Sequence, residues 1–175
     1  MVQINDQTIT DVYYRLSDLN EEQVTTLMDT MAAEQPSVLA YLMANAGEMS
    51  SSMESEVLMF TGVVLWHAFK EHYPSMAAVS EDMLDDNEQD NIELMHRLDE
   101  LSMQGEIDAV QKMMDEYSQP MLLQYALSAI SNEEYEEEEG EEEIAEEDLI
   151  SEEAQGAMII VFKTIIDSFI ATADQ

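Results

Sequence analysis

The sequence predicts an all-α fold, a compact bundle of about seven to eight helices. Apolar residues recur at spacings of three and four, which places them on one face of a helix. The chain of 175 residues has only five Gly and three Pro, too few to supply the turns of a many-stranded sheet. Hydrophobic residues make up 46% of the chain, so a core can form despite the high charge.

Local start and stop signals define the first three expected helices. A first short helix is predicted by apolar residues spaced i, i+3, i+4, i+7, namely Ile9, Val12, Tyr13 and Leu16. Asn20 followed by Gln23 is a capping-box pattern that begins the second helix. Pro36 ends that helix and opens the third, because its fixed φ suits a first helical turn, and Gly47 closes the third.

Four more helices are expected before residue 131. Ser51 to Ser55 is a polar joint that precedes the most apolar helix, Val57 to Phe69. Since apolar residues lie all round this helix, we expect it at the buried centre of the bundle. A helix with an acidic first turn follows Ser80, Gly105 separates it from the next, and Pro120 starts the last of the seven.

Composition then divides the single expected domain, residues 1–175, into three parts. The helical bundle covers 1–131. A Glu-rich stretch at 132–150 is expected to be a flexible loop, because like charges at i, i+4 spacings oppose helix formation. The stretch 151–173 is an apolar helix that we expect to dock back on the bundle. No internal repeat of fixed period is visible, which argues against a solenoid.

The charge balance excludes several classes of function. With 40 Asp and Glu against five Lys and Arg, the net charge is −35, so direct binding of nucleic acid or of anionic membrane surfaces is not expected. Cysteine is absent, which excludes disulfides and thiolate zinc sites. The N-terminal sequence lacks a secretory signal pattern, and we expect a cytoplasmic protein without a cofactor.

Two acidic patterns were weighed as cation sites. Glu93 and His96 have the Glu-x-x-His spacing of di-iron carboxylate bundles, but no second copy is present, so a solvent-facing pair on an acidic helix is favoured. The twelve residues from Asp82 to Glu93 resemble a calcium loop in their acids. That comparison fails, because Leu84 offers no oxygen at position three and Asn87 replaces the required Gly at position six.

Aromatic, histidine and methionine residues give weaker signals. Trp66 is expected in the core, with His67 and His72 near the end of their helix rather than acting as general bases. Most of the fifteen methionines sit at core positions, among them Met28, Met31, Met43, Met95, Met113 and Met114. Met49, Met53, Met76 and Met103 fall in joints, where their adaptable side chains could line an exposed groove.

These observations favour a non-enzymatic protein–protein interaction or regulatory module that engages a basic partner. The interaction candidates are the acids Glu136, Glu137, Glu138, Glu139, Glu141, Glu142 and Glu143. Three alternatives stay open. The acidity can be an adaptation to a salty environment, the chain can mimic a nucleic acid, or it can be a carboxylate-metal enzyme using Glu93 and His96.

The last helix suggests one further partner, a second copy of the chain. Its apolar stripe consists of Met158, Phe162, Ile165, Ile166, Phe169 and Ile170, and Ile159, Ile160 and Val161 widen it. Because this arc is wider than one docking face needs, a homodimer through this helix is expected.

Overall fold

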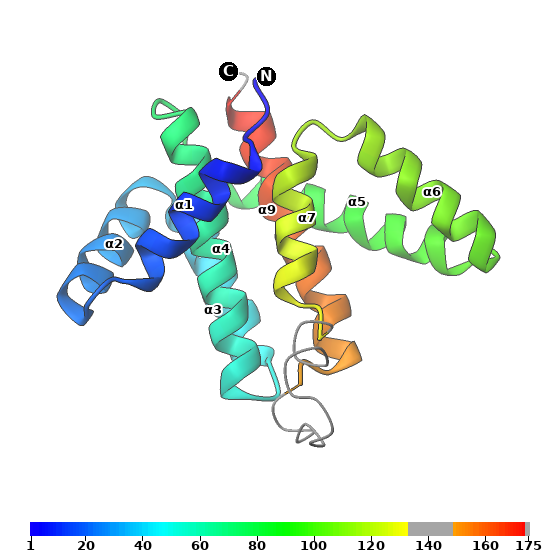
Figure 1. Cartoon of the computed structure of the whole chain (residues 1–175), viewed down its shortest axis with the longest axis horizontal. Coiled ribbons are helices and arrows are strands. Elements are labelled where there is room, and N and C mark those ends of the chain that lie inside the picture. The colour runs from blue at the N-terminus through cyan, green and yellow to red at the C-terminus, as the bar shows by residue number, and fades with distance from the viewer. Residues whose placement is uncertain (133–148, 174–175) are drawn as a thin grey trace.

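The computed structural model describes residues 1–132 and 149–173 (Figure 1). Eight helices and no strand lie within these residues, which confirms the predicted all-α class. In chain order they are α1 (Asp6–Ser17), α2 (Glu21–Glu34), α3 (Pro36–Glu48), α4 (Ser52–His72), α5 (Glu81–Asp99), α6 (Met103–Glu116), α7 (Pro120–Ala129) and α9 (Glu152–Ala173).

The predicted helix starts are largely confirmed, and three boundaries are corrected. Asn20 and Gln23 form the expected capping box, and prolines open α3 and α7. However, α3 runs one residue past Gly47, and α4 begins inside the expected joint, with Ser51 as its N-cap. Gly105 does not separate two helices: it lies in the first turn of α6, where its N–H donates to the Oγ of Ser102.

The core is centred on the two most apolar helices, α4 and α9, which pack against each other and against α7. Trp66, Phe69, Phe162 and Phe169 are its largest buried side chains. Ten residues of α9 are buried, so the last helix does dock back on the bundle. By length and composition α9 could also cross a membrane, but a buried core helix meets the same criterion.

The order of elements in α1–α4 recurs in α5–α9 among the described residues. In both series an extended segment leads into two helices, then a Gln-Pro pair opens a short helix, and a serine-capped long helix follows. Gln35-Pro36-x-x-Leu39-x-Tyr41 has the same pattern as Gln119-Pro120-x-x-Leu123-x-Tyr125. The connections differ in length between the two series, which is why the sequence has no fixed period.

The buried positions of α4 also recur in α9 at equal distances from the capping serines Ser51 and Ser151. The equivalent buried pairs are Glu54 and Ala154, Leu58 and Met158, Thr61 and Val161, Gly62 and Phe162, Val64 and Thr164, Leu65 and Ile165, Trp66 and Ile166, Ala68 and Ser168, and Phe69 and Phe169. Both helices therefore present the same face to the core.

Contacts between the helices follow an approximate two-fold relation. Helix α1 packs on α4 as α5 packs on α9, and α1 contacts α7 as α5 contacts α3. The rings of the equivalent residues Phe69 and Phe169 touch, with centroids 5.1 Å apart, as expected of equivalent residues next to a two-fold axis. In Figure 1, α2 and α6 correspondingly lie at opposite sides of the molecule, with α4 and α9 between them.

Two buried glutamines, Gln35 and Gln119, each form hydrogen bonds with a backbone segment in the other half of the chain. The side chain of Gln119 accepts the N–H of Ile4 (2.8 Å) and donates to the carbonyl of Val2 (2.9 Å). Gln35 makes the same pair of bonds with the extended segment before α5, accepting from Val79 (2.9 Å) and donating to the carbonyl of Ala77 (3.0 Å). Each glutamine thus provides hydrogen-bond partners for backbone groups in an extended segment, which have no partners within a helix.

Glu54 is a buried carboxylate that caps two helices at once, and only 2% of it is exposed. One oxygen accepts the N–H groups of Ser50 and Ser51 before α4, and the other accepts the N–H (3.1 Å) and hydroxyl (2.7 Å) of Ser151 before α9. Burial alone would raise the pKa of Glu54, but these hydrogen bonds outweigh burial and hold its pKa below the ordinary value.

We expect Glu54→Gln to lower the free energy of unfolding by about 1–3 kcal/mol at neutral pH, because one amide N–H₂ would then face N–H donors. Since the folded pKa is the lower one, the carboxylate stabilises the fold above its unfolded pKa, and this stabilisation is lost as pH falls through the folded pKa. Urea unfolding of both proteins in a pH series should show the difference shrinking in acid. Glu56→Gln, an exposed site on α4, is the control. A difference that grows in acid would contradict this account.

Gln119→Met should release the N-terminal segment while keeping side-chain volume, because the Ile4 N–H and the Val2 carbonyl lose their partners. We expect a loss of about 1–3 kcal/mol of stability and faster hydrogen exchange at the Ile4 amide. Gln124→Met, on the exposed side of α7, should leave that amide protected. Parent-like protection of Ile4 in Gln119→Met would show that the glutamine does not hold this segment.

Candidate functional site

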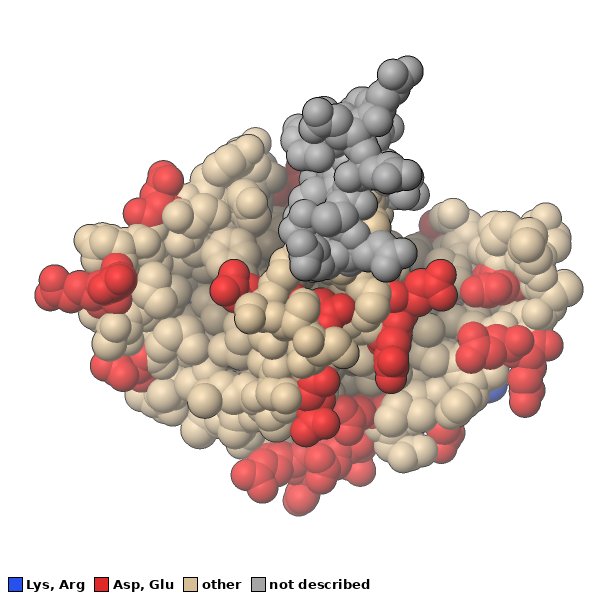
Figure 2. All heavy atoms as spheres, turned by 90° about the horizontal axis from the view of Figure 1, so that it is seen from below, with Lys and Arg blue, Asp and Glu red and all other residues tan. Residues whose placement is uncertain are grey.

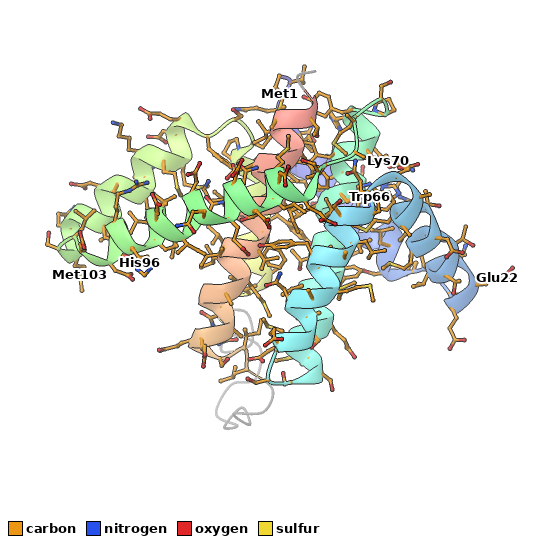
Figure 3. All side chains as sticks on the ribbon, turned by 180° about the vertical axis from the view of Figure 1, so that it is seen from behind. Met1, Glu22, Trp66, Lys70, His96 and Met103 are labelled. Carbon is orange, nitrogen blue, oxygen red and sulfur yellow. The ribbon has the colours of Figure 1, made fainter. Side chains whose placement is uncertain are left out.

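The residues weighed as a metal site lie on an exposed surface of α5. Glu93 and His96 are both exposed, and Glu93 accepts a hydrogen bond from the Gln89 side chain (3.2 Å). Figure 3 shows His96 near the outer end of the arm that α5 and α6 form. Within residues 1–132 and 149–173, no group of three or more His, Asp or Glu side chains is arranged to hold a metal ion.

The other acidic patterns contribute no site in the described part of the chain. Asp82 to Glu93 lies entirely within α5, so these residues form a helix and not a cation-binding loop. The interaction candidates Glu136, Glu137, Glu138, Glu139, Glu141, Glu142 and Glu143 lie outside the described residues.

The structure places the Trp–His segment of α4 where the sequence predicted it. Trp66 is buried, and His67 and His72 lie in the last two turns of α4. Burial lowers the pKa of His67, although Glu71 nearby acts in the opposite direction. Arg15 on α1 forms an ion pair with Glu71 (2.5 Å), so this end of α4 is used to hold α1.

The methionines divide differently from the prediction at two places. Met31 is buried as expected, but Met43 is 60% exposed because it lies on the outer face of α3. Met49 and Met53, expected in a polar joint, are partly buried and pack against the core. Met103 is 80% exposed and borders a shallow hollow on α6 (Figure 3).

Basic side chains are largely committed to the protein's own carboxylates. Lys70 pairs with Glu34 (2.6 Å), and Lys163 pairs with Asp167 (2.8 Å). With the Arg15 ion pair, three of the five Lys and Arg residues are engaged in this way. Figure 2 shows several separate groups of acidic side chains across the visible face, between larger areas of other residues, and almost no basic side chains, so the charge on this face is nearly all of one sign.

A groove between α1, α2 and α4 is the first concave surface that the sequence did not predict. We call it the apolar groove; its volume is about 590 Å³, and it is lined by Leu16, Leu19, Val24, Leu27, Met28, Glu56, Met59, Phe60 and Val63. Glu56 is the one charged residue among them. The groove is open because α2 packs on α3 rather than closing over α1.

A second hollow, the aromatic pocket, lies between α1, α4 and α7. Its volume is about 480 Å³, and Tyr13, Tyr14, Phe60 and Tyr125 line it together with Asp6 and several hydroxyl residues. The ring of Tyr13 is the hub, with centroids 5.4 Å from Tyr14, 5.5 Å from Phe60 and 6.5 Å from Tyr125. All three pairs meet edge to face, the arrangement in which the edge of one ring points at the face of the next.

A partly buried polar network joins α9 to α5 and to the end of α6. Asp167 accepts hydrogen bonds from Tyr117 (2.6 Å), Asn91 (3.2 Å) and Lys163 (2.8 Å). Burial, then the Asp167 charge, raises the pKa of Tyr117, which therefore stays protonated as a donor. Each of these side chains has a hydrogen-bond partner within the network. A structural role therefore accounts for the network.

No family model, curated protein or solved structure matches this chain. The candidate site is therefore defined by geometry alone, as two hollows on the α1–α4 side of the molecule. Phe60 lines both of them, so they adjoin across α4. Sequence spacing placed Tyr13 on the buried face of its helix, yet it is 40% exposed because the pocket opens beside it.

Purified protein should contain no iron, manganese or zinc at stoichiometric level, and Glu93→Gln and His96→Ala should leave its metal content and melting temperature unchanged. Both side chains are exposed, and Glu93 is hydrogen-bonded to a glutamine. Elemental analysis of mildly purified protein tests this. Stoichiometric metal that is lost in either variant would restore the carboxylate-metal alternative.

Proposed function

We propose that this chain is a non-enzymatic interaction module that binds a basic, amphipathic helical segment of a partner protein in the apolar groove. The observation that carries the proposal is an open apolar groove on a chain in which acidic residues outnumber basic ones by 40 to 5. An amphipathic helix places aliphatic residues at i, i+3, i+4 and i+7, which matches a groove lined on three sides by helices.

Charge complementarity selects the occupant. The net charge of −35 attracts and orients a cationic segment before contact, and disfavours acidic ones. One carboxylate, Glu56 on α4, lines the groove, and Asp18, Glu21 and Glu22 are close in the chain to its lining residues Leu19 and Val24. Lysines on the polar face of a bound helix would meet these carboxylates.

Two groove residues suit a surface that accommodates different partner side chains. Met28 and Met59 are flexible and polarisable, and such residues recur on surfaces that bind varied helices. Val24, which lines the groove, is 42% exposed, so part of its apolar surface is available to a partner. Covering it would give the partner an apolar contact that charge alone does not provide.

The experiment titrates the full chain with two lysine–leucine peptides of identical composition, one ordered as an amphipathic helix and one scrambled. We expect the amphipathic peptide to bind more tightly, with an affinity that weakens as salt screens the charges. Val24→Glu, which adds a negative charge inside the groove, should weaken binding about tenfold, since it removes an apolar contact. Thr25→Glu is the matched control: it adds the same charge at the next, exposed position of α2.

The competing explanations give different results. If acidity is only an adaptation to salt, neither peptide binds at moderate salt. If the chain is a nucleic-acid mimic that acts by charge alone, the two peptides bind equally and Val24→Glu binds at least as tightly as the parent. Either result would overturn the proposed groove.

A further inference from the structure

The aromatic pocket has the composition of a site for a positively charged organic group. Aromatic ring faces attract cations through their quadrupole, and an ammonium group within about 6 Å of a ring centroid gains from it. Tyr13, Phe60 and Tyr125 bring such rings from three different helices, and Asp6 adds a carboxylate. None of the residues that line the pocket is Lys, Arg or His, so no internal cation from the lining fills it.

The equivalent place in the other half of the molecule shows what the pocket lacks. Tyr41 stands on α3 where Tyr125 stands on α7, in the shared Gln-Pro pattern. Counting from the N-caps Asn5 and Ser80, Glu88 on α5 takes the position that Tyr13 has on α1. There the hydroxyl of Tyr41 donates to Glu88, so the two side chains satisfy each other.

In the α1–α4 half that internal pairing is replaced by aromatic rings that meet edge to face. Tyr13 has no carboxylate partner of this kind, and its ring is 6.5 Å from that of Tyr125 at an interplanar angle of 70°. A carboxylate is present at the pocket, but it is Asp6 in the first turn of α1. The two halves have thus diverged so that one place is closed by a hydrogen bond and the other is an aromatic hollow.

The volume of the pocket and the negative charge of the chain are both compatible with a bound organic cation. A volume of about 480 Å³ lies within the range of small-ligand sites, about 300–1,000 Å³. The negative field of the whole chain raises the local concentration of cations. Phe60 connects this pocket to the apolar groove, so a helix bound in the groove lies within reach of it.

We propose that the aromatic pocket binds an organic ammonium cation, with the rings of Tyr13, Phe60 and Tyr125 around it and Asp6 as its counter-ion. The inference rests on the proposed function only for the source of the cation, which is then a lysine side chain of the basic partner.

The test follows ring proton resonances of the full chain by NMR during titration with choline, with n-butylammonium and with 3,3-dimethylbutan-1-ol. The last compound is a neutral isostere of choline, so it separates charge from shape. We expect saturable shifts with the two cations, at dissociation constants of the order of millimolar, and none with the alcohol. Binding of n-butylammonium assigns the pocket to lysine side chains, and binding of choline alone assigns it to quaternary ammonium compounds.

Variants make the test specific to the pocket. Asp6→Asn and Tyr13→Leu should each weaken binding about fivefold or more. Asp6 is exposed, so its variant tests the pocket even if Tyr13→Leu disturbs packing. Asp11→Asn is the matched control, because it removes the same charge from α1 at a residue that does not line the pocket. Equal binding of the neutral alcohol, parent-like binding by Asp6→Asn, or no saturable shift would overturn the inference.

These readouts are independent of the peptide experiment. If the peptide binds the groove while no small cation binds, the pocket inference fails and the proposed function stands. If the cations bind with the expected sensitivity to Asp6→Asn while the peptide does not bind, the pocket stands and the proposed partner is wrong.

Discussion

The mutual burial of α4 and α9 is the constraint on which the rest of the structure depends. Neither helix has a polar face wide enough to meet water, so each must be covered on several sides. They meet at Phe69 and Phe169, and Glu54 caps the first turns of both. The shorter helices α1, α3, α5 and α7 then cover the remaining sides in equivalent ways. A surface with a charge of −35 is tolerated because this apolar centre opposes its self-repulsion.

The two halves use the same framework but hold their first helices by different chemistry. Helix α5 is fixed to α9 by polar residues, with Asn87 bonded to Ser168 and Asn91 to Thr164. At the equivalent distances from the N-cap, α1 places Val12 and Leu16, which are buried. A satisfied polar network fixes register, whereas apolar contacts leave a neighbouring surface freer to change. The apolar groove and the aromatic pocket both lie on the apolar side.

The helices could be predicted from local signals in the sequence. The contacts between distant parts of the chain could not. Asn20, Ser80 and Pro120 act within a few residues, so their roles could be read directly. Ser51 and Glu54 have the spacing of a local capping box, but the second cap that Glu54 provides, at Ser151, depends on a contact between residues 97 positions apart. The Gln-Pro-x-x-Leu-x-Tyr pattern was recognised as a repeat only from the structure, because its two copies have no fixed period and the groups that each glutamine bonds lie in the other half of the chain. The aromatic pocket likewise needs Tyr13 and Tyr125, which the sequence gives no reason to pair. A dimer through α9, suggested by its wide apolar arc, stays a prediction, and α4, α5 and α7 already cover much of that arc.

The high negative charge of the chain and its open apolar surfaces are physically related, because the charge opposes self-association through those surfaces. An exposed apolar groove normally favours self-association, since covering it removes nonpolar area from water. Two copies of this chain approach with charges of −35 each, and that repulsion opposes contact between their grooves. A basic helix meets attraction instead, and by neutralising carboxylates beside the groove it lowers the cost of covering Val24 and its neighbours. On this argument the charge keeps the groove available to a cationic partner and closed to copies of the same chain.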